Sequence, residues 1–391
     1  MTTTARPHRD VNSLPAVASA ILLGTLGVLS FIIQPGEVQG FVEFAHLSDA
    51  LANQVVGMEM MGVALATILT AAIGERLDWR QVLLGALILA VVGNIASAFC
   101  VGKALFVPAR FLAGLGHGVI ISLSFTFVGL TRHPDRNIAL YLVALLTYGA
   151  FGLWVLPSLL AHLGFVFLFG FFAIATALGL VTLPFVPASS EGREHVSPTA
   201  IAFDWKLALL ALGGVLAYNL AQGIAWANLG LIGTALGLKD QVVADNLFVS
   251  QVCAVVGAVL SVVLAGRLKR GWLITVGILG GAAFIALLGL PTAAALFLIS
   301  VCGFNFLWNF VLPFILGAVG DLDLHGRIMG PAIALQMTGL GLGPILSSLL
   351  ITATGYGQVE TACIGFFIAS LVLLALPIAI HHVRLLKQAA A

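Results

Sequence analysis

The sequence predicts an all-α membrane protein with twelve transmembrane helices in two pseudo-symmetric six-helix bundles. Of its 391 residues, 60% are hydrophobic and 8% are charged, whereas a soluble domain carries about 25% charged residues. Apolar runs of about 20 residues, the length that crosses a bilayer, recur along the chain. Basic residues occupy every second connection between these runs. Because lipid cannot pair open strand edges, runs of this length are expected to be helices.

The basic residues also predict the orientation of the chain. Of the 17 Lys and Arg residues, only Lys103 and Lys239 lie in the intervening connections, and Arg110 lies inside a run. Basic connections stay on the cytoplasmic side during insertion. We therefore expect a multi-pass protein of the inner (plasma) membrane, embedded in the lipid bilayer, with both termini cytoplasmic. The basic connections contain Arg6, Arg9, Arg76, Arg80, Arg132, Arg136, Arg193, Lys206, Arg267, Lys269, Arg270, Arg327, Arg384 and Lys387.

The predicted spans divide into two halves at the longest polar connection. We expect an N-terminal bundle over 1–186, a cytoplasmic linker over 187–204 and a C-terminal bundle over 205–391. Arg76 and Arg267 are 191 residues apart, as are Arg136 and Arg327, and this equal offset indicates duplicated halves in parallel orientation. The predicted spans are 14–34, 51–73, 81–101, 104–130, 138–160, 163–186, 205–232, 243–265, 271–290, 292–319, 327–353 and 358–380.

Composition and motifs exclude several classes of function. The net charge of +1 comes from basic residues spread over loops, so no nucleic-acid partner is expected. The four cysteines lack metal-ligand spacing and are expected to pack as thiols. No metal and no cofactor are predicted. The sequence contains no HExxH, GxSxG or P-loop motif, so we expect neither an enzyme nor a protein that hydrolyses ATP through a P-loop.

Charged and glycine-rich motifs accompany this topology. One lies in the connection after the second span, a second copy follows the eighth span, and a third motif lies within the fourth span. The first contains Glu75, Arg76, Asp78 and Arg80, the second contains Arg267 and Arg270, and the third reads Arg110-Phe-Leu-Ala-Gly114-Leu-Gly116-His117-Gly118.

With these motifs and its six-plus-six topology, the chain resembles the major facilitator superfamily over essentially its whole length. The resemblance implies a secondary transporter that works by alternating access between two bundles, usually as a monomer. It also implies that the loops after the second and eighth spans latch one conformation. The run in the fourth span is common in the drug/proton antiporter branch, whereas the fifth span has only Gly149, Gly152 and Pro157 at a looser spacing.

Ionisable residues inside the predicted spans are candidates for proton coupling, because such residues are costly in a bilayer and usually functional. Glu59, Arg110 and His117 lie well inside, and Glu37 lies near an outer end. At 1.5 Å per residue, Glu59 is about 12 Å and Arg110 about 9 Å from the outer side. Burial favours a neutral carboxyl group and a guanidinium favours an ionised one, so separating this pair would bind a proton. A static pair that fixes helix packing is the alternative.

Polar side chains gather in two of the four spans, numbered 1, 4, 7 and 10, that the resemblance places around a central cavity. They suit a neutral or weakly polar, partly aromatic ligand, although such amides can also join helices by hydrogen bonds. The expected cavity residues are Gln34, Tyr218, Asn219, Gln222, Trp226, Asn305, Trp308 and Asn309.

We therefore expect a proton-coupled secondary transporter of a small organic molecule, whose partners are that substrate and protons. The apolar cavity and the motif in the fourth span favour efflux of a lipophilic compound. Uptake of a small organic acid, for example an aromatic one, is an alternative in which Arg110 binds the carboxylate. A passive facilitator or a transport-inactive sensor is a further alternative.

Overall fold

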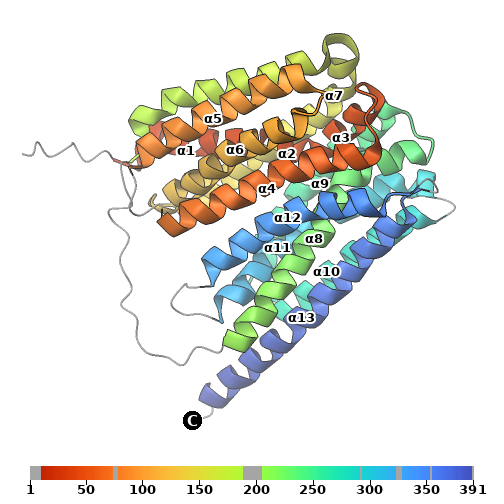
Figure 1. Ribbon diagram of the computed structural model, residues 1–391. Coiled ribbons are helices and arrows are strands. Elements are labelled where there is room, and N and C mark those ends of the chain that lie inside the picture. Colours follow the sequence, from red (N-terminus) through yellow and green to blue (C-terminus); the bar gives the residue numbers. More distant parts are fainter. Residues whose placement is uncertain are drawn as a thin grey trace, which may run out of the picture.

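The structure, a computed structural model, describes residues 10–73, 78–187, 205–290, 293–322, 328–352 and 355–389. Regular structure within these ranges is helical apart from one isolated bridge between Thr352 and Gly355, which confirms the all-α prediction. The two halves of the chain lie side by side, the first in red to yellow-green and the second in green to blue (Figure 1). Of the predicted linker 187–204, only residue 187 is described.

The helices agree with the predicted spans in number and order. Ten described stretches are long and apolar enough to cross a membrane. One of them, Arg136–Phe185, contains both the fifth and the sixth predicted spans, and the first span contains a shorter helix. The first half comprises α1 (Leu14–Gly27), α2 (Leu29–Ile32), α3 (Gln34–Glu43), α4 (Asp49–Ile73), α5 (Trp79–Cys100), α6 (Phe106–Gly129), α7 (Pro134–Leu178) and η2 (Gly179–Phe185).

The second half has fewer interruptions than the first. Its first helix, α8, is buried along most of its length, because it packs against α12 and α13 of its own half and against α3 of the first half. The helices are α8 (Trp205–Ala235), α9 (Asp240–Leu264), α10 (Arg270–Ala286), η3 (Leu287–Gly289), α11 (Ala293–Gly320), α12 (Met329–Leu350) and α13 (Gly357–Ala389).

The first span is longer than predicted and is broken. The sequence predicts one helix over 14–34, but the structure has three consecutive helices that reach Glu43. The breaks fall at Val28 and Ile33, whose backbone angles depart from helical values. Pro35 follows the second break, and a proline lacks the N–H that a continuous helix would need there. The prediction missed α3 because Gln34, Glu37 and Gln39 interrupt the apolar run.

The fifth and sixth spans meet at a sharp reversal rather than a loop. The helical assignment runs through α7, but Gly164 has φ 68° and ψ −174°, which is not helical. A positive φ of this kind suits glycine because it has no Cβ. The predicted boundary between 160 and 163 therefore lies close to the observed turn.

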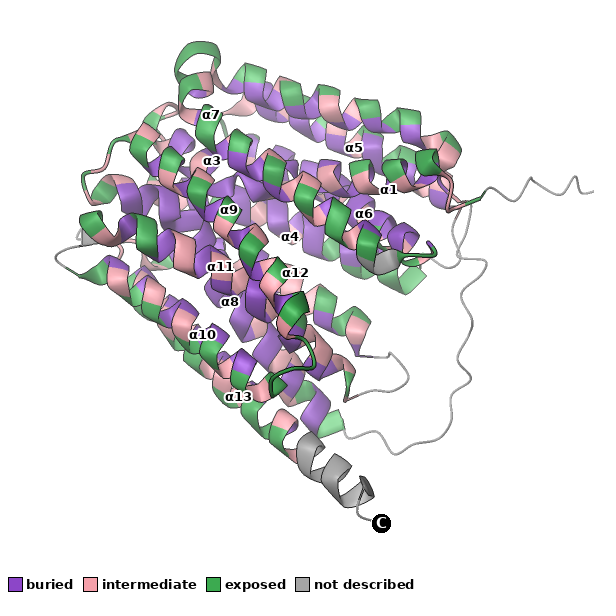
Figure 2. Cartoon of the chain, turned by 180° about the vertical axis from the view of Figure 1, so that it is seen from behind, coloured by how far each residue is buried: buried purple, intermediate pink, exposed green. Residues whose placement is uncertain are grey.

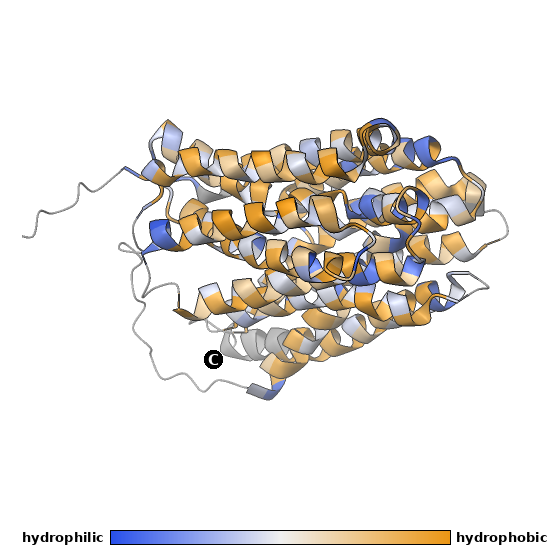
Figure 3. Ribbon diagram, turned by 45° about the horizontal axis from the view of Figure 1, so that its top comes forward, coloured by the Kyte–Doolittle hydropathy of each residue, from blue (hydrophilic) through white to orange (hydrophobic). Residues whose placement is uncertain are grey.

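Large apolar side chains cover the outward faces of the helices. Val262, Leu349 and Val372 are all more than half exposed, and exposed residues lie on the outer helix faces with buried residues between helices (Figure 2). Hydrophobic residues extend along the middle of the helices, and hydrophilic ones gather towards the ends (Figure 3). A soluble protein would not expose so much apolar surface, and these faces suit lipid.

The two halves are joined near the connections 44–48, 236–239 and 351–356, on the side that the charge pattern predicts to be outer. Gln39 donates to Asp240 at 2.8 Å, and Asn53 donates to Asn228 at 3.0 Å. Helices α4 and α12 also cross closely here, because Gly57 and Gly341 leave room for each other's helix. In this conformation the predicted outer side is therefore held together by direct contacts between the halves.

Candidate functional site

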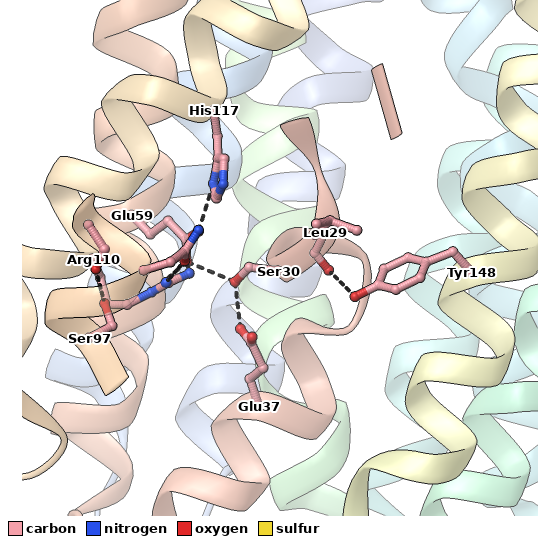
Figure 4. A network of polar contacts seen from close by, with 10 residues as sticks. Leu29, Ser30, Glu37, Glu59, Ser97, Arg110, His117 and Tyr148 are labelled. Atoms are coloured by element: carbon pink, nitrogen blue, oxygen red, sulfur yellow. Dashed lines mark hydrogen bonds and ion pairs between the residues drawn. The ribbon is translucent and has the colours of Figure 1, made fainter. Parts of the chain in front are cut away.

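The ionisable residues singled out in the sequence form one buried cluster within the first half. Glu37, on α3, Glu59, on α4, and Arg110 and His117, on α6, are each at most 3% exposed. Figure 4 shows their side chains converging, with Ser30 between the two carboxyl groups. The cluster lies among three helices that the sequence separates by long connections.

Arg110 is fully engaged by neighbouring side chains. Its Nη2 forms an ion pair with Glu59 Oε2, and its Nε lies 3.2 Å from the same oxygen. Its Nη1 donates to Asn94 Oδ1 on α5 at 2.8 Å. The guanidinium carbon lies 4.8 Å from the ring centre of Phe169, a cation–π arrangement. The guanidinium therefore has no free donor edge that faces the second half.

Glycines on α6 allow this pairing, because they let the helix backbone approach α4. A Cβ at Gly114 would collide with the backbone oxygen of Glu59, and one at Gly118 would collide with that of Val63. Small residues of this kind permit close helix contact inside membranes. The motif that begins at Arg110 thus supplies both the cation and the close approach that brings the cation to Glu59.

Glu59 also contacts a titratable residue on its other oxygen. His117 Nδ1 lies 3.4 Å from Glu59 Oε1. Histidine changes charge near neutral pH when it is accessible. The cluster therefore contains three kinds of group that can gain or lose a proton or respond to one.

Ser30 connects the second carboxyl group to the first. Its Oγ lies 2.6 Å from Glu37 Oε2 and 2.8 Å from Glu59 Oε2. The short helix α2 that carries Ser30 is further held by Tyr148 on α7, whose hydroxyl donates to the backbone oxygen of Leu29 at 3.0 Å. Glu37, which the sequence places near a span end, is thus completely buried beside Glu59.

The second half has no equivalent charge at the corresponding positions. At the offset of 191 residues, Ser250 stands in place of Glu59 and Trp308 stands in place of His117. Ser250 accepts a hydrogen bond from Asn305 at 2.7 Å, so a neutral contact on α9 and α11 replaces the ionic contact on α4 and α6. The chemistry of protons is thereby concentrated in the first half.

An aromatic group lies where the two halves meet. The rings of Trp226 and Trp308 are 5.8 Å apart, and those of Phe31 and Trp308 are 6.3 Å apart. Trp226 Nε1 donates to the backbone oxygen of Phe31 at 2.9 Å. Beside these rings lies a small apolar cluster that includes Met60 and Leu340. Five helices, α2, α4, α8, α11 and α12, contribute to this region.

The remaining residues expected in a cavity are divided between this region and helix packing. The amide of Asn219 donates to Val215 on its own helix at 2.8 Å, and its Cβ faces Gly339 on α12. The ring of Tyr218 packs against Phe367 of α13. Asn309 donates to the backbone oxygen of Asn305 at 3.0 Å.

Two buried glutamines retain unused hydrogen-bonding capacity. Gln34, at the start of α3, has neither amide atom partnered among the described residues, and Gln222 Oε1, one turn before Trp226, has no partner there. Buried amides without partners are rare in folded proteins. Both therefore remain candidates for contact with a polar group of a ligand.

The predicted latch loops are described only in part. Glu75 and Arg76 lie outside the described residues. Asp78 caps α5 by accepting from the backbone N–H of Arg80 at 3.0 Å. Arg80 Nε donates to the backbone oxygen of Val186 at 2.7 Å, within the first half.

The second copy of the latch motif lies on the surface. Arg267 is exposed, and Arg270 forms an exposed ion pair with Asp321 within the second half. The described contacts of both motifs therefore stay inside one half, and a latch between halves remains a prediction.

Sequence reasoning missed Ser30, Asn94 and Phe31. Ser30 and Asn94 are polar residues inside apolar runs, which is a usable signal for interhelical hydrogen bonds. Nothing in the sequence distinguishes Phe31 from the chain's other phenylalanines. Among the described residues, no group of His, Cys, Asp or Glu could hold a metal ion.

No family model matches the chain. It is 23% identical over 354 residues to an uncharacterized MFS-type transporter, YfhI, of Bacillus subtilis (strain 168), which covers 81% of this chain and 84% of that protein. The fold is similar to the crystal structure of a D-xylose-proton symporter, with a TM-score of 0.70, 18% identity and coverage of 91% and 96% of the two chains. It is also similar to the nucleoside transporter NupG, with a TM-score of 0.69, 13% identity and coverage of 93% and 99%.

Proposed function

We propose that this chain, a major facilitator superfamily transporter by its fold and its relatives, is a secondary active transporter that couples a proton to a small neutral molecule. It would work by alternating access between its two halves, as a monomer in the inner membrane with both termini cytoplasmic. The observation that carries the proposal is the buried cluster of Glu59, Arg110 and His117.

Glu59 is the residue that best fits proton coupling. Keeping a carboxylate and a guanidinium inside a membrane is costly unless each satisfies the other. Protonation of Glu59 would remove half of the ion pair and leave Arg110 to Asn94 and Phe169. A conformational change that separates α4 from α6 would therefore depend on the proton, which is what coupling requires. The similarity to a D-xylose-proton symporter supports a proton as the coupling ion.

The contacts of Arg110 argue against a carboxylate substrate. Its donors are taken by Glu59 and Asn94, and one ring face is covered by Phe169. The uptake of an organic acid would require Arg110 to leave these partners. A neutral substrate that binds against Trp226 and Trp308 requires no such rearrangement.

The aromatic group where the halves meet favours a lipophilic or aromatic substrate, because flat apolar surfaces and a few polar groups are typical of such binding sites. Efflux of such a compound fits this region and the glycine motif of α6. A neutral hydroxylated solute is the second candidate. It is favoured by the unpartnered amides of Gln34 and Gln222 and by the structural neighbour that carries D-xylose.

Replacement of Glu59 tests the proposal. The purified protein in liposomes would be supplied with Nile red or radiolabelled D-xylose, and an inside-to-outside pH gradient would be imposed in each direction. We expect the wild-type protein to move one of these probes uphill. Glu59→Gln should lose uphill movement but keep exchange of the probe, because exchange needs no net proton movement.

Glu360→Gln is the matched control, since Glu360 is a half-buried carboxyl group on α13, in the other half. It should behave like the wild-type protein. Uphill transport by Glu59→Gln would contradict the role of Glu59. Flux of the wild-type protein that ignores the pH gradient would instead indicate a passive facilitator.

A further inference from the structure

Ser30 lies between two buried carboxyl groups at distances that both require a hydrogen atom. Its Oγ is 2.6 Å from Glu37 Oε2 and 2.8 Å from Glu59 Oε2. Both separations are within the range of O–H···O hydrogen bonds. Oxygen atoms this close without a hydrogen between them would repel each other.

The number of hydrogen atoms available sets the protonation of the group. A serine hydroxyl has one hydrogen to donate, and an ionised carboxylate can only accept. If both glutamates were ionised, Ser30 could satisfy one contact and the other would have no hydrogen. One of the two carboxyl groups must therefore be a carboxylic acid that donates to Ser30 Oγ.

The surroundings indicate which carboxyl group carries the proton. Glu59 is surrounded by donors, with two nitrogens of Arg110 on one oxygen and His117 near the other. Glu37 is 0% exposed, and its Oε1 has no hydrogen-bond partner among the described residues. An ionised carboxylate is far more costly to bury without partners than a neutral acid. Glu59 is thus the ionised member and Glu37 the neutral one.

Other titratable groups near Glu37 do not replace this arrangement. Tyr148 on α7 directs its hydroxyl to the backbone oxygen of Leu29 and not to the carboxyl group. Arg110 and His117, from α6, contact Glu59. The contact of Glu37 with the cluster therefore passes through Ser30.

We propose that Glu37 holds a proton in this conformation and that Ser30 passes it to Glu59. In this step the Oε2–H bond of Glu37 breaks as its proton joins Ser30 Oγ, and the former Ser30 proton joins Glu59 Oε2. Ser30 ends unchanged, Glu37 becomes a carboxylate and Glu59 becomes a neutral acid. The ion pair of Glu59 with Arg110 is lost at the same time. This inference rests on the proposed function, because it adds a second proton site and a relay to Glu59.

Infrared spectroscopy tests the location of the proton without a substrate. A carboxylic acid has a C=O stretching band separate from that of a carboxylate. The purified wild-type protein at neutral pH should show such a band, which shifts when the protein is moved into D₂O. Glu37→Asp should move the band to the frequency of an aspartic acid, whereas Glu59→Asp should leave it in place.

These two variants keep a carboxyl group at each position, so neither removes the charge that Arg110 requires. Glu360→Gln is the control for a contribution from the half-buried carboxyl group on α13 and should not change the band. Circular dichroism would establish that each variant is folded. A band that moves with Glu59→Asp alone, or the absence of any acid band in the folded wild-type protein, would overturn the proposal.

Variants of Ser30 test the relay. Ser30→Ala should move the band to higher frequency, because the acid loses its acceptor, and should slow its shift in D₂O severalfold. Ser30→Thr keeps a hydroxyl and should retain the wild-type rate. Ser124→Ala is the control, since the buried Ser124 hydroxyl donates only to the backbone oxygen of Ala20. An unchanged band and exchange rate in Ser30→Ala would exclude Ser30 as the link.

These measurements fail separately from the transport test. Transport that is lost in Glu59→Gln, with an acid band that follows Glu59, would retain the coupling and refute the relay. An acid band that follows Glu37 in a protein whose flux ignores pH would retain the proton site and refute the coupling.

Discussion

Arg110 shows how a single buried side chain can join several helices. Its guanidinium contacts Glu59 on α4, Asn94 on α5 and Phe169 on α7. Arginine suits this position because its planar group offers several donors in fixed directions and remains charged. A lysine would provide the charge but could not reproduce the paired contacts with Glu59 together with that of Asn94.

Removing the charge of Arg110 should be strongly destabilising. Arg110→Met leaves Glu59 without its main partner, and breaking a buried ion pair typically costs about 3–5 kcal/mol. We expect a marked fall in melting temperature of the detergent-purified protein. The double variant Arg110→Met/Glu59→Gln should recover part of this loss, because no uncompensated charge remains.

The exposed ion pair of Arg270 and Asp321 provides the control for this prediction. Surface pairs contribute about 0–1 kcal/mol, so Arg270→Met should change the melting temperature little. If the double variant were no more stable than Arg110→Met, the unpaired charge of Glu59 would not be the cause of the destabilisation.

Among the elements, α6 has two faces with different roles. One face carries Arg110, Gly114, His117 and Gly118, and it lies against α4. Gly116 meets Ala86 and Ala90 of α5 in the same way. The helix is thus enclosed by neighbouring backbones, and the position of Arg110 relative to Glu59 is set by glycine packing as well as by charge.

Substitution of glycines on α6 should separate packing from helix propensity. Gly114→Ala places a methyl group against the backbone of Glu59, so it should lower the melting temperature and weaken the cluster. Gly129→Ala, at the exposed end of the same helix, has nothing within 4 Å of the new methyl group. Because alanine is favoured over glycine in helices by about 1 kcal/mol, Gly129→Ala should be neutral or stabilising. Equal effects of the two variants would contradict the role of close packing.

At the scale of the whole molecule, the two halves meet through polar and glycine contacts on the predicted outer side. Tyr356 donates to Asp49 at 2.5 Å, and burial raises the pKa of this hydroxyl, so it remains a donor at neutral pH. Gln54, on α4, donates to Ser348 on α12 at 3.4 Å. These contacts must separate if the outer side opens during alternating access.

A side chain inserted between α4 and α12 should open the predicted outer side. A Cβ at Gly57 would lie 2.6 Å from Ile345 Cγ1 and 3.0 Å from the backbone oxygen of Gly341. Gly57→Val should therefore force the halves apart. The measurement is labelling of a cysteine at the buried position Ala227, by Ala227→Cys in a background without the native cysteines, using a membrane-impermeant maleimide.

We expect labelling from the outer side to rise severalfold in Gly57→Val. Gly85→Val is the control, because a Cβ at Gly85 on α5 meets nothing within 4 Å. Labelling that stays low in Gly57→Val would show that this crossing does not hold the outer side closed.

The sequence by itself determined the helical class, the number and order of spans and the identity of the main buried charges. These follow from the bilayer, which admits helices of a given length and makes charges such as Glu59 and Arg110 rare. Only the tertiary structure decided that Ser30 joins Glu37 to Glu59, that Asn94 holds Arg110 and that Phe31 meets Trp308. Such contacts depend on helix breaks at Val28 and Ile33 and on glycine-controlled distances between helices. Residues in separate spans carry no local pattern that records those distances.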